Sequence, residues 1–173
     1  MPHRKKHHLP EEVYEGNNHV LYLTICTANR ARRLAESDLA TITRDEMLGL
    51  HRDFPVLGYC IMPDHVHIMM CNAGSQLGLI MNRFKGRTSR LIRKARPGLD
   101  VWQEGYWDHI VRREEGLYKV LQYILLNPVR AGLAEYWWEY EWLGAPLLGE
   151  VGPDLFIHAA AEDIVWRDLL AVE

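Results

Sequence analysis

Cysteine is scarce in this chain, which has 173 residues but only Cys26, Cys60 and Cys71. The count is odd and no pair has CxxC spacing, so the sequence argues against a disulfide framework and against a zinc knuckle. Long apolar runs are also lacking, since no segment approaches the roughly 18 apolar residues that a membrane-spanning helix needs. Residues 1–10 lack the apolar segment of a secretion signal. We therefore predict reduced thiols, no membrane partner and a cytoplasmic location.

Acidic side chains are missing from residues 72–99, a segment that carries seven basic ones. These are Arg83, Lys85, Arg87, Arg90, Arg93, Lys94 and Arg96. Residues 135–173 have the opposite imbalance, with nine acidic side chains and only Arg167 as a base. The formal net charge of −3 therefore hides 19 basic against 14 acidic side chains in residues 1–134. This segregation indicates a polyanionic partner such as nucleic acid, while a basic helix face that is merely solvated remains an alternative.

The hydrophobic pattern predicts an α+β domain. Strands are expected at residues 19–27, 54–62, 65–71 and 106–112, where β-branched, aromatic and apolar residues cluster. Helices are expected at residues 37–52 and 77–96, and from residue 117 to just before the Asn127-Pro128 pair. The first six elements follow the order of the ferredoxin-like βαββαβ fold, an antiparallel sheet with two helices on one face. The last helix is additional to that unit.

Residues 1–134 are predicted to form one domain, and residues 135–173 an acidic extension that is rich in tryptophan. The tryptophans of the extension are Trp137, Trp138, Trp142 and Trp166. So many large rings are not expected to remain in water. We therefore predict that the extension packs on the same domain.

Two histidines stand at alternate positions of the strand predicted at residues 65–71. Because successive side chains of a strand point to opposite faces, His65 and His67 share one face. Their imidazoles can converge on one metal ion. From the spacing alone, a polar strand face without a metal remains the alternative.

The last helix carries two further candidates. Tyr123 lies about 130° from the centre of the apolar stripe, and Asn127 falls on the same flank if the helix continues. An amide oxygen and two imidazoles suit a divalent ion with open positions, which would polarise a phosphoryl oxygen for attack by the Tyr123 hydroxyl. Tyr118 is a weaker candidate nucleophile because it lies on the opposite flank. A tyrosine that only hydrogen-bonds to the sheet is the alternative for Tyr123.

The helical period places several basic residues of the helix predicted at residues 77–96 on one flank. Arg83, Arg87, Arg90 and Lys94 follow each other at helical spacing and form one flank, a predicted track for phosphates. Together with Lys85 they are the predicted DNA-binding residues. Several other residues have open roles. Trp102, Tyr106 and Trp107 are expected either to stack on exposed bases or to pack in the core. Glu104 and Asp108 are considered as helpers in catalysis, but neither is assigned that role. Arg4, Lys5 and Lys6 are expected to form either a basic arm in a nucleic-acid groove or a disordered terminus.

Four stretches of the chain carry a family resemblance. They are GYCIMPDHVHIMM at residues 58–70, MNRFKGRTSRLI at 81–92, WQEGYWDHIVRREEG at 102–116 and YILLNPVRAGL at 123–133. Together they resemble the REP-associated tyrosine transposases, bacterial relatives of the single-tyrosine transposases that mobilise small insertion sequences as single-stranded DNA. The segment after residue 133 departs from the family pattern, because it is acidic and lacks the paired serines that follow in many relatives.

The resemblance implies an HUH endonuclease fold over residues 1–134, with the last helix as a catalytic helix. It further implies that His65 and His67 bind Mg²⁺ or Mn²⁺ and that Asn127 is a third ligand. Tyr123 would be the nucleophile that forms a 5′-phosphotyrosine link. The implied partner is single-stranded DNA at hairpins of repetitive extragenic sequence, in the bacterial cytoplasm close to the nucleoid.

The sequence therefore predicts a metal-dependent single-stranded DNA endonuclease and strand transferase, acting as a monomer or a homodimer. A first alternative is a protein without catalytic activity that binds hairpin DNA or RNA and regulates repetitive elements. A second is an unrelated metal hydrolase built on the two histidines, which would leave the acid-free basic helix unexplained.

Overall fold

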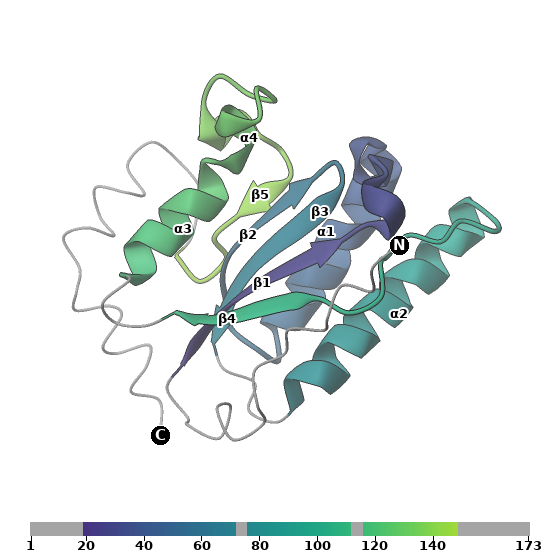
Figure 1. Ribbon diagram of the computed structural model, residues 1–173, viewed down its shortest axis with the longest axis horizontal. Helices are drawn as coiled ribbons and strands as arrows, with labels where there is room; N and C mark the ends of the chain where they lie inside the picture. The colour runs from purple at the N-terminus through teal and green to yellow at the C-terminus, as the bar shows by residue number, and fades with distance from the viewer. Residues whose placement is uncertain (1–18, 72–75, 112–115, 149–173) are drawn as a thin grey trace.

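The computed structural model describes residues 19–71, 76–111 and 116–148. Within them the chain forms the predicted elements in the predicted order (Figure 1). These are β1 (Val20–Cys26), α1 (Ser37–His51), β2 (Val56–Met62), β3 (His65–Cys71), α2 (Leu77–Ala95), β4 (Trp107–Val111) and α3 (Leu117–Leu125). Then follow α4 (Asn127–Arg130) and β5 (Leu143–Gly144), and short 3-10 helices lie at Ala28–Arg30, Arg33–Ala35 and Trp137–Glu139. No helix in the described ranges is long and apolar enough to cross a membrane.

The strands form one antiparallel sheet in the order β4-β1-β3-β2-β5. Its first four strands have the ferredoxin-like arrangement, so the predicted fold class is confirmed. β2 and β3 form a hairpin, which turns at Pro63 and Asp64 and pairs Met62 with His65. β5 was not predicted, because a strand of two residues is too short to show an alternating pattern.

The two faces of the sheet are covered by different helices. α1 and α2 pack on the face formed by Leu21, Leu23 and Ile25 of β1, and bury Phe84 of α2. α3 packs on the opposite face, where Leu121 and its neighbours cover β2 and β3. Figure 1 shows α1 and α2 together on one side of the sheet and α3 on the other. The helix that carries the predicted nucleophile therefore occupies its own face.

The contact between α3 and β2 depends on a glycine. A Cβ atom added to Gly58 would overlap the Leu121 Cδ1 atom, and Leu121 is fully buried and has little room to move. We expect Gly58→Ala to lower the free energy of unfolding by about 1–3 kcal/mol through overpacking. The matched control is Gly49→Ala in α1, where nothing lies within 4 Å, and it should raise stability by up to about 1 kcal/mol. Urea unfolding of both variants measures the difference, and equal effects would contradict this account of the contact.

Part of the C-terminal extension lies within the described residues. Trp137 is buried in the core on the α3 side, and the Tyr140 hydroxyl donates to the carbonyl oxygen of Ile61 in β2 at 2.9 Å. Trp138 is 38% exposed and stacks on Tyr136, so not every tryptophan of the extension is buried. Trp142 is half-buried against the core on the α1 and α2 side. Trp166 falls in residues 149–173 and lies outside the described residues.

Candidate active site

The two predicted histidines lie side by side on the face of β3 that α3 covers. His67 is paired in register with Thr24 of β1, and His65 with Met62 of β2. The Nε2 atoms of His65 and His67 approach to 3.0 Å, and the rings meet edge to face with centroids 4.6 Å apart. The alternation expected from the strand therefore brings both imidazoles to one point.

The opposite ring nitrogens are held by hydrogen bonds. The Nδ1 atom of His65 lies 2.7 Å from the Asp64 carboxylate, which in turn pairs with Arg30 at 3.3 Å. The Nδ1 atom of His67 lies 2.9 Å from the Tyr22 hydroxyl and 3.0 Å from the Thr24 hydroxyl. Such partners fix the ring orientation and leave the Nε2 atoms facing each other, as in metal sites where an outer group orients each histidine.

Burial and charge keep His67 suited to a metal. Burial lowers the pKa of His67 to about 3, and the nearby positive charges of His65 and Arg30 add to the effect. His67 is therefore a neutral imidazole at physiological pH, the form that can donate a lone pair. Burial alone would raise the pKa of Asp64, but the hydrogen bonds and charges of His65 and Arg30 outweigh it and hold that pKa below its usual range.

The distance between the two Nε2 atoms fits one divalent ion. Two neighbouring ligands at about 2.1 Å from an octahedral ion lie about 3.0 Å apart, which matches the separation of His65 and His67. Within the described residues no cluster of three or more His, Cys, Asp or Glu side chains could hold a metal. A metal at the histidine pair would therefore need an amide, water or substrate oxygens for its remaining positions.

Tyr123 reaches the histidine pair from helix α3. Its ring centroid is 6.0 Å from that of His67 and 6.2 Å from that of Tyr22, and the residue is 41% exposed. The guanidinium carbon of Arg130 lies over the Tyr123 ring, 4.6 Å from its centroid. Burial raises the pKa of Tyr22, which keeps this neighbouring hydroxyl protonated and makes it a support for His67 rather than a nucleophile. Tyr123 is thus an exposed phenol beside two converging imidazoles and a cation.

Asn127 has a different environment from the one the helical projection assumed. α3 ends at Leu125, and Asn127 begins the separate short helix α4. Its side-chain nitrogen donates to the carbonyl oxygen of Tyr123 at 2.8 Å. This bond uses the amide nitrogen and not the oxygen, so it fixes the end of the helix behind Tyr123. The role of Asn127 as a metal ligand stays a prediction.

The sequence reading missed the residues that support the site. Tyr22 and Thr24 could not be found without the pairing of β1 with β3, which brings together segments 43 to 45 residues apart. Asp64 lies in the turn between two predicted strands, where an acidic residue does not by itself indicate a histidine partner. Arg130 did leave a signal, because it stands seven residues after Tyr123 in the NPVR stretch, and this spacing returns to the same side of a helix.

The chain is similar to a known protein family. Residues 13–126 match the family described as "Transposase IS200 like". The chain belongs to the IS200-like transposase family. A Haemophilus influenzae protein provisionally named a REP-associated tyrosine transposase is 25% identical over 118 residues, which cover 60% of this chain and 67% of that protein. A second, uncharacterized H. influenzae protein is 26% identical over 161 residues, covering 73% and 89%.

A solved structure of a REP-associated tyrosine transposase bound to a REP hairpin has the same fold. Its TM-score with this IS200-like transposase is 0.63 at 19% identity, over 75% of this chain and 78% of that one. At this identity the similarity shows the fold, and it agrees with the antiparallel sheet and the helices described above.

The predicted DNA-binding residues of this transposase lie on α2, on the opposite face of the sheet from the histidine pair. Arg83, Arg90 and Lys94 are exposed, and no acidic partner for them occurs among the described residues. Arg87 is exposed but forms an ion pair with Glu46 of α1 at 2.6 Å. These arginines and the lysine therefore form a surface that is separated from Tyr123 by the sheet.

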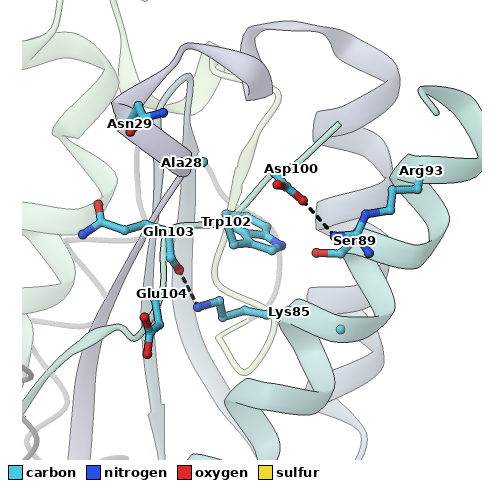
Figure 2. Close-up of a pocket in the computed structure, with 10 residues that line it drawn as sticks. Ala28, Asn29, Lys85, Ser89, Arg93, Asp100, Trp102, Gln103 and Glu104 are labelled. Atoms are coloured by element: carbon cyan, nitrogen blue, oxygen red, sulfur yellow. Dashed lines mark hydrogen bonds and ion pairs between the residues drawn. The ribbon is translucent and has the colours of Figure 1, made fainter. Parts of the chain in front are cut away.

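Lys85 differs from the rest of the basic set. Its ammonium group donates to the carbonyl oxygens of Gln103 and Gly105 at 2.7 and 2.8 Å, and burial lowers its pKa. It lines an open pocket of about 640 Å³ between α2 and residues 100–104. Figure 2 shows Lys85 reaching toward Gln103, and Arg93 paired with Asp100. Lys85 thus ties the chain before β4 to α2, a structural role that the sequence could not reveal.

Of the three aromatic residues expected either to stack on bases or to pack in the core, two pack in the core and one is exposed. Trp102 packs on Phe84, and its indole nitrogen donates to Thr88 at 2.7 Å, while Tyr106 packs on the same core. Trp107 is 43% exposed on β4, on the α3 face of the sheet. Of the two acidic residues considered as helpers, Asp108 is buried and points to the α1 and α2 face, away from the histidines. Glu104 lines the pocket of Figure 2.

Proposed function

We propose that this protein is a metal-dependent single-stranded DNA endonuclease and strand transferase that acts at REP-like hairpins through a 5′-phosphotyrosine intermediate. The observation that supports the proposal best is the position of the exposed Tyr123 ring, 6.0 Å from His67, whose Nε2 atom lies 3.0 Å from that of His65. A nucleophile beside two ligand-competent imidazoles is what a metal-assisted attack on a phosphodiester requires.

The reaction exchanges one phosphodiester for another. The Tyr123 oxygen forms a bond with the scissile phosphorus, and the bond from phosphorus to the 3′ oxygen breaks. The phenol loses one proton and the released 3′-hydroxyl gains one, so no net proton, oxidant or external energy source is needed. Attack by a 3′-hydroxyl on the phosphotyrosine is the reverse step and transfers the strand. Strand transfer therefore uses the same residues as cleavage.

The histidines and their partners supply the environment for this exchange. A bound Mg²⁺ or Mn²⁺ would act as a Lewis acid on the phosphate. His65 and His67 would hold it, oriented by Asp64, Tyr22 and Thr24. Asn127, whose amide is already fixed close to Tyr123, is the candidate for a third ligand.

The exposed basic residues of α2 are proposed to bind the backbone of the hairpin, although they lie across the sheet from Tyr123. Lys85 joins α2 to the segment that precedes β4, so the β4 edge is where the basic surface and the active-site face come close. DNA that contacts both surfaces would pass over this edge. Phosphate contacts of this kind give affinity and salt dependence with little sequence reading.

The proposal is tested with single strands that contain the hairpin repeats flanking the gene of this protein. Each strand is labelled at the 5′ or the 3′ end, incubated with protein and Mg²⁺ or Mn²⁺, and separated on a denaturing gel. We expect an adduct of protein with the 3′ fragment, a free 5′ fragment, and loss of both on chelation. Tight hairpin binding without an adduct in either metal would instead support a binding protein that regulates repetitive elements.

Arg130 provides a further prediction. Its guanidinium lies over the Tyr123 ring, where it can bind an oxygen of the attacked phosphate. We expect Arg130→Gln to slow adduct formation in single-turnover assays on the order of 100-fold. Arg130→Lys, which keeps the charge but not the planar fork, should recover part of the rate. An Arg130→Gln variant that cuts at the wild-type rate would show that Arg130 only packs against the tyrosine.

A further inference from the structure

The tryptophan of β4 is exposed to solvent although it lies on the sheet. Trp107 is 43% exposed, whereas Trp102 and Tyr106, close to it in sequence, pack against the core. An exposed aromatic ring leaves in water an apolar surface that burial in the core would have removed. Aromatic rings at exposed positions are typical of surfaces that bind a partner.

The surroundings of Trp107 hold its ring in a fixed orientation. The His109 ring lies nearly parallel to it, with centroids 5.8 Å apart and an interplanar angle of 13°. The Tyr22 ring meets it edge to face at 5.3 Å. Because both neighbours belong to the sheet, the indole is positioned by rigid elements rather than by a loop. A preorganised ring of this kind binds a planar partner at a low cost in side-chain entropy.

Trp107 also lies beside the candidate active site. In the register of the sheet it is opposite Thr24, whose hydroxyl bonds His67, and Tyr22 contacts both Trp107 and Tyr123. A single aromatic ring, that of Tyr22, therefore stands between Trp107 and the Tyr123 nucleophile. A strand whose phosphate reaches Tyr123 brings a neighbouring nucleotide to Trp107.

The edge position of β4 points to a nucleobase as the occupant. β4 is the terminal strand of the sheet, and α2 with its exposed arginines is tied to the segment that precedes it. A DNA strand that leaves the active site for this basic surface crosses β4 at Trp107. Unpaired bases in such a path stack on aromatic rings whatever their sequence, since every base has a π-face.

From these observations we infer that Trp107, backed by His109, is a stacking platform for an unpaired base next to the scissile phosphate. The inference rests on the proposed function in that it takes Tyr123 and the histidine pair as the cleavage centre. It adds a binding subsite for one nucleotide, and it assigns this subsite to β4 and not to the tyrosine helix.

The test uses binding, so that it does not depend on cleavage. Hairpin oligonucleotides carry 2-aminopurine at one position at a time through the single-stranded flank, and they are bound by Tyr123→Phe protein, which keeps the ring and leaves the DNA intact. We expect one position to be quenched on binding. Trp107→Leu should abolish this quench and weaken binding about five- to a hundredfold, while Trp107→Phe should retain most of both.

The matched control is Trp138→Ala, which removes another exposed tryptophan from the extension and should change neither signal. An abasic site at the quenched position should weaken binding to Trp107 protein and have no further effect with Trp107→Leu. Quenching that persists in Trp107→Leu overturns the platform while leaving the proposed function intact. If the wild-type protein forms no adduct in either metal but the quench depends on Trp107, the cleavage proposal fails and the base-stacking surface stands.

Discussion

Replacing Tyr123 with Phe is expected to abolish the covalent protein–DNA adduct and to leave hairpin binding close to the wild-type level. The change removes only the hydroxyl oxygen, so the ring contacts with Tyr22, His67 and Arg130 can persist. Without that oxygen no ester bond to phosphorus can form, and the loss should be at least about a thousandfold. Denaturing gels measure the adduct, and a filter-binding titration measures affinity for the hairpin.

The control for this variant is Tyr118→Phe. Tyr118 lies on the same helix and was the competing candidate from sequence, so the same chemical change at that position separates loss of the nucleophile from disturbance of α3. We expect it to form the adduct at a rate within a fewfold of wild type. If Tyr123→Phe still forms the adduct and Tyr118→Phe does not, Tyr118 is the nucleophile and the assignment of Tyr123 is overturned.

Much of the fold could be predicted because its signals are local. The alternation in residues 65–71 placed His65 and His67 on one face, and the stripe of the last helix placed Tyr123 off the core. The order of elements then indicated the ferredoxin-like sheet, which the structure confirms. Each of these inferences needs only neighbouring residues and a backbone period.

The rest depends on contacts between distant segments. The environment of His67 is made by β1, and the tie between Lys85 and residues 103–105 depends on how α2 settles on the sheet. A helical projection treats Lys85 as one more exposed cation, because it contains no information on the backbone carbonyls that approach the helix. For the same reason Trp107 could not be told from Trp102 until the position and the neighbours of each ring were known.

The second large effect concerns the histidine pair. His65→Ala removes one of two Nε2 atoms that lie 3.0 Å apart, so we expect Mn²⁺ affinity, measured by calorimetry, to fall below detection, with loss of the adduct. Asp64→Asn keeps both imidazoles but weakens the partner that orients His65, so it should reduce Mn²⁺ affinity about 10- to 100-fold and leave some cleavage.

A full loss of Mn²⁺ affinity in His65→Ala with a partial loss in Asp64→Asn would identify His65 as a ligand, because a histidine with only a structural role would not affect Mn²⁺ affinity in this way. The control is His51→Ala on α1, whose ring accepts a hydrogen bond from the backbone nitrogen of Val56 and lies on the opposite face of the sheet. It should lower stability and leave Mn²⁺ binding unchanged. If His65→Ala binds Mn²⁺ and cuts DNA as well as the wild type, the metal binds elsewhere and the two imidazoles have only a structural role in the sheet.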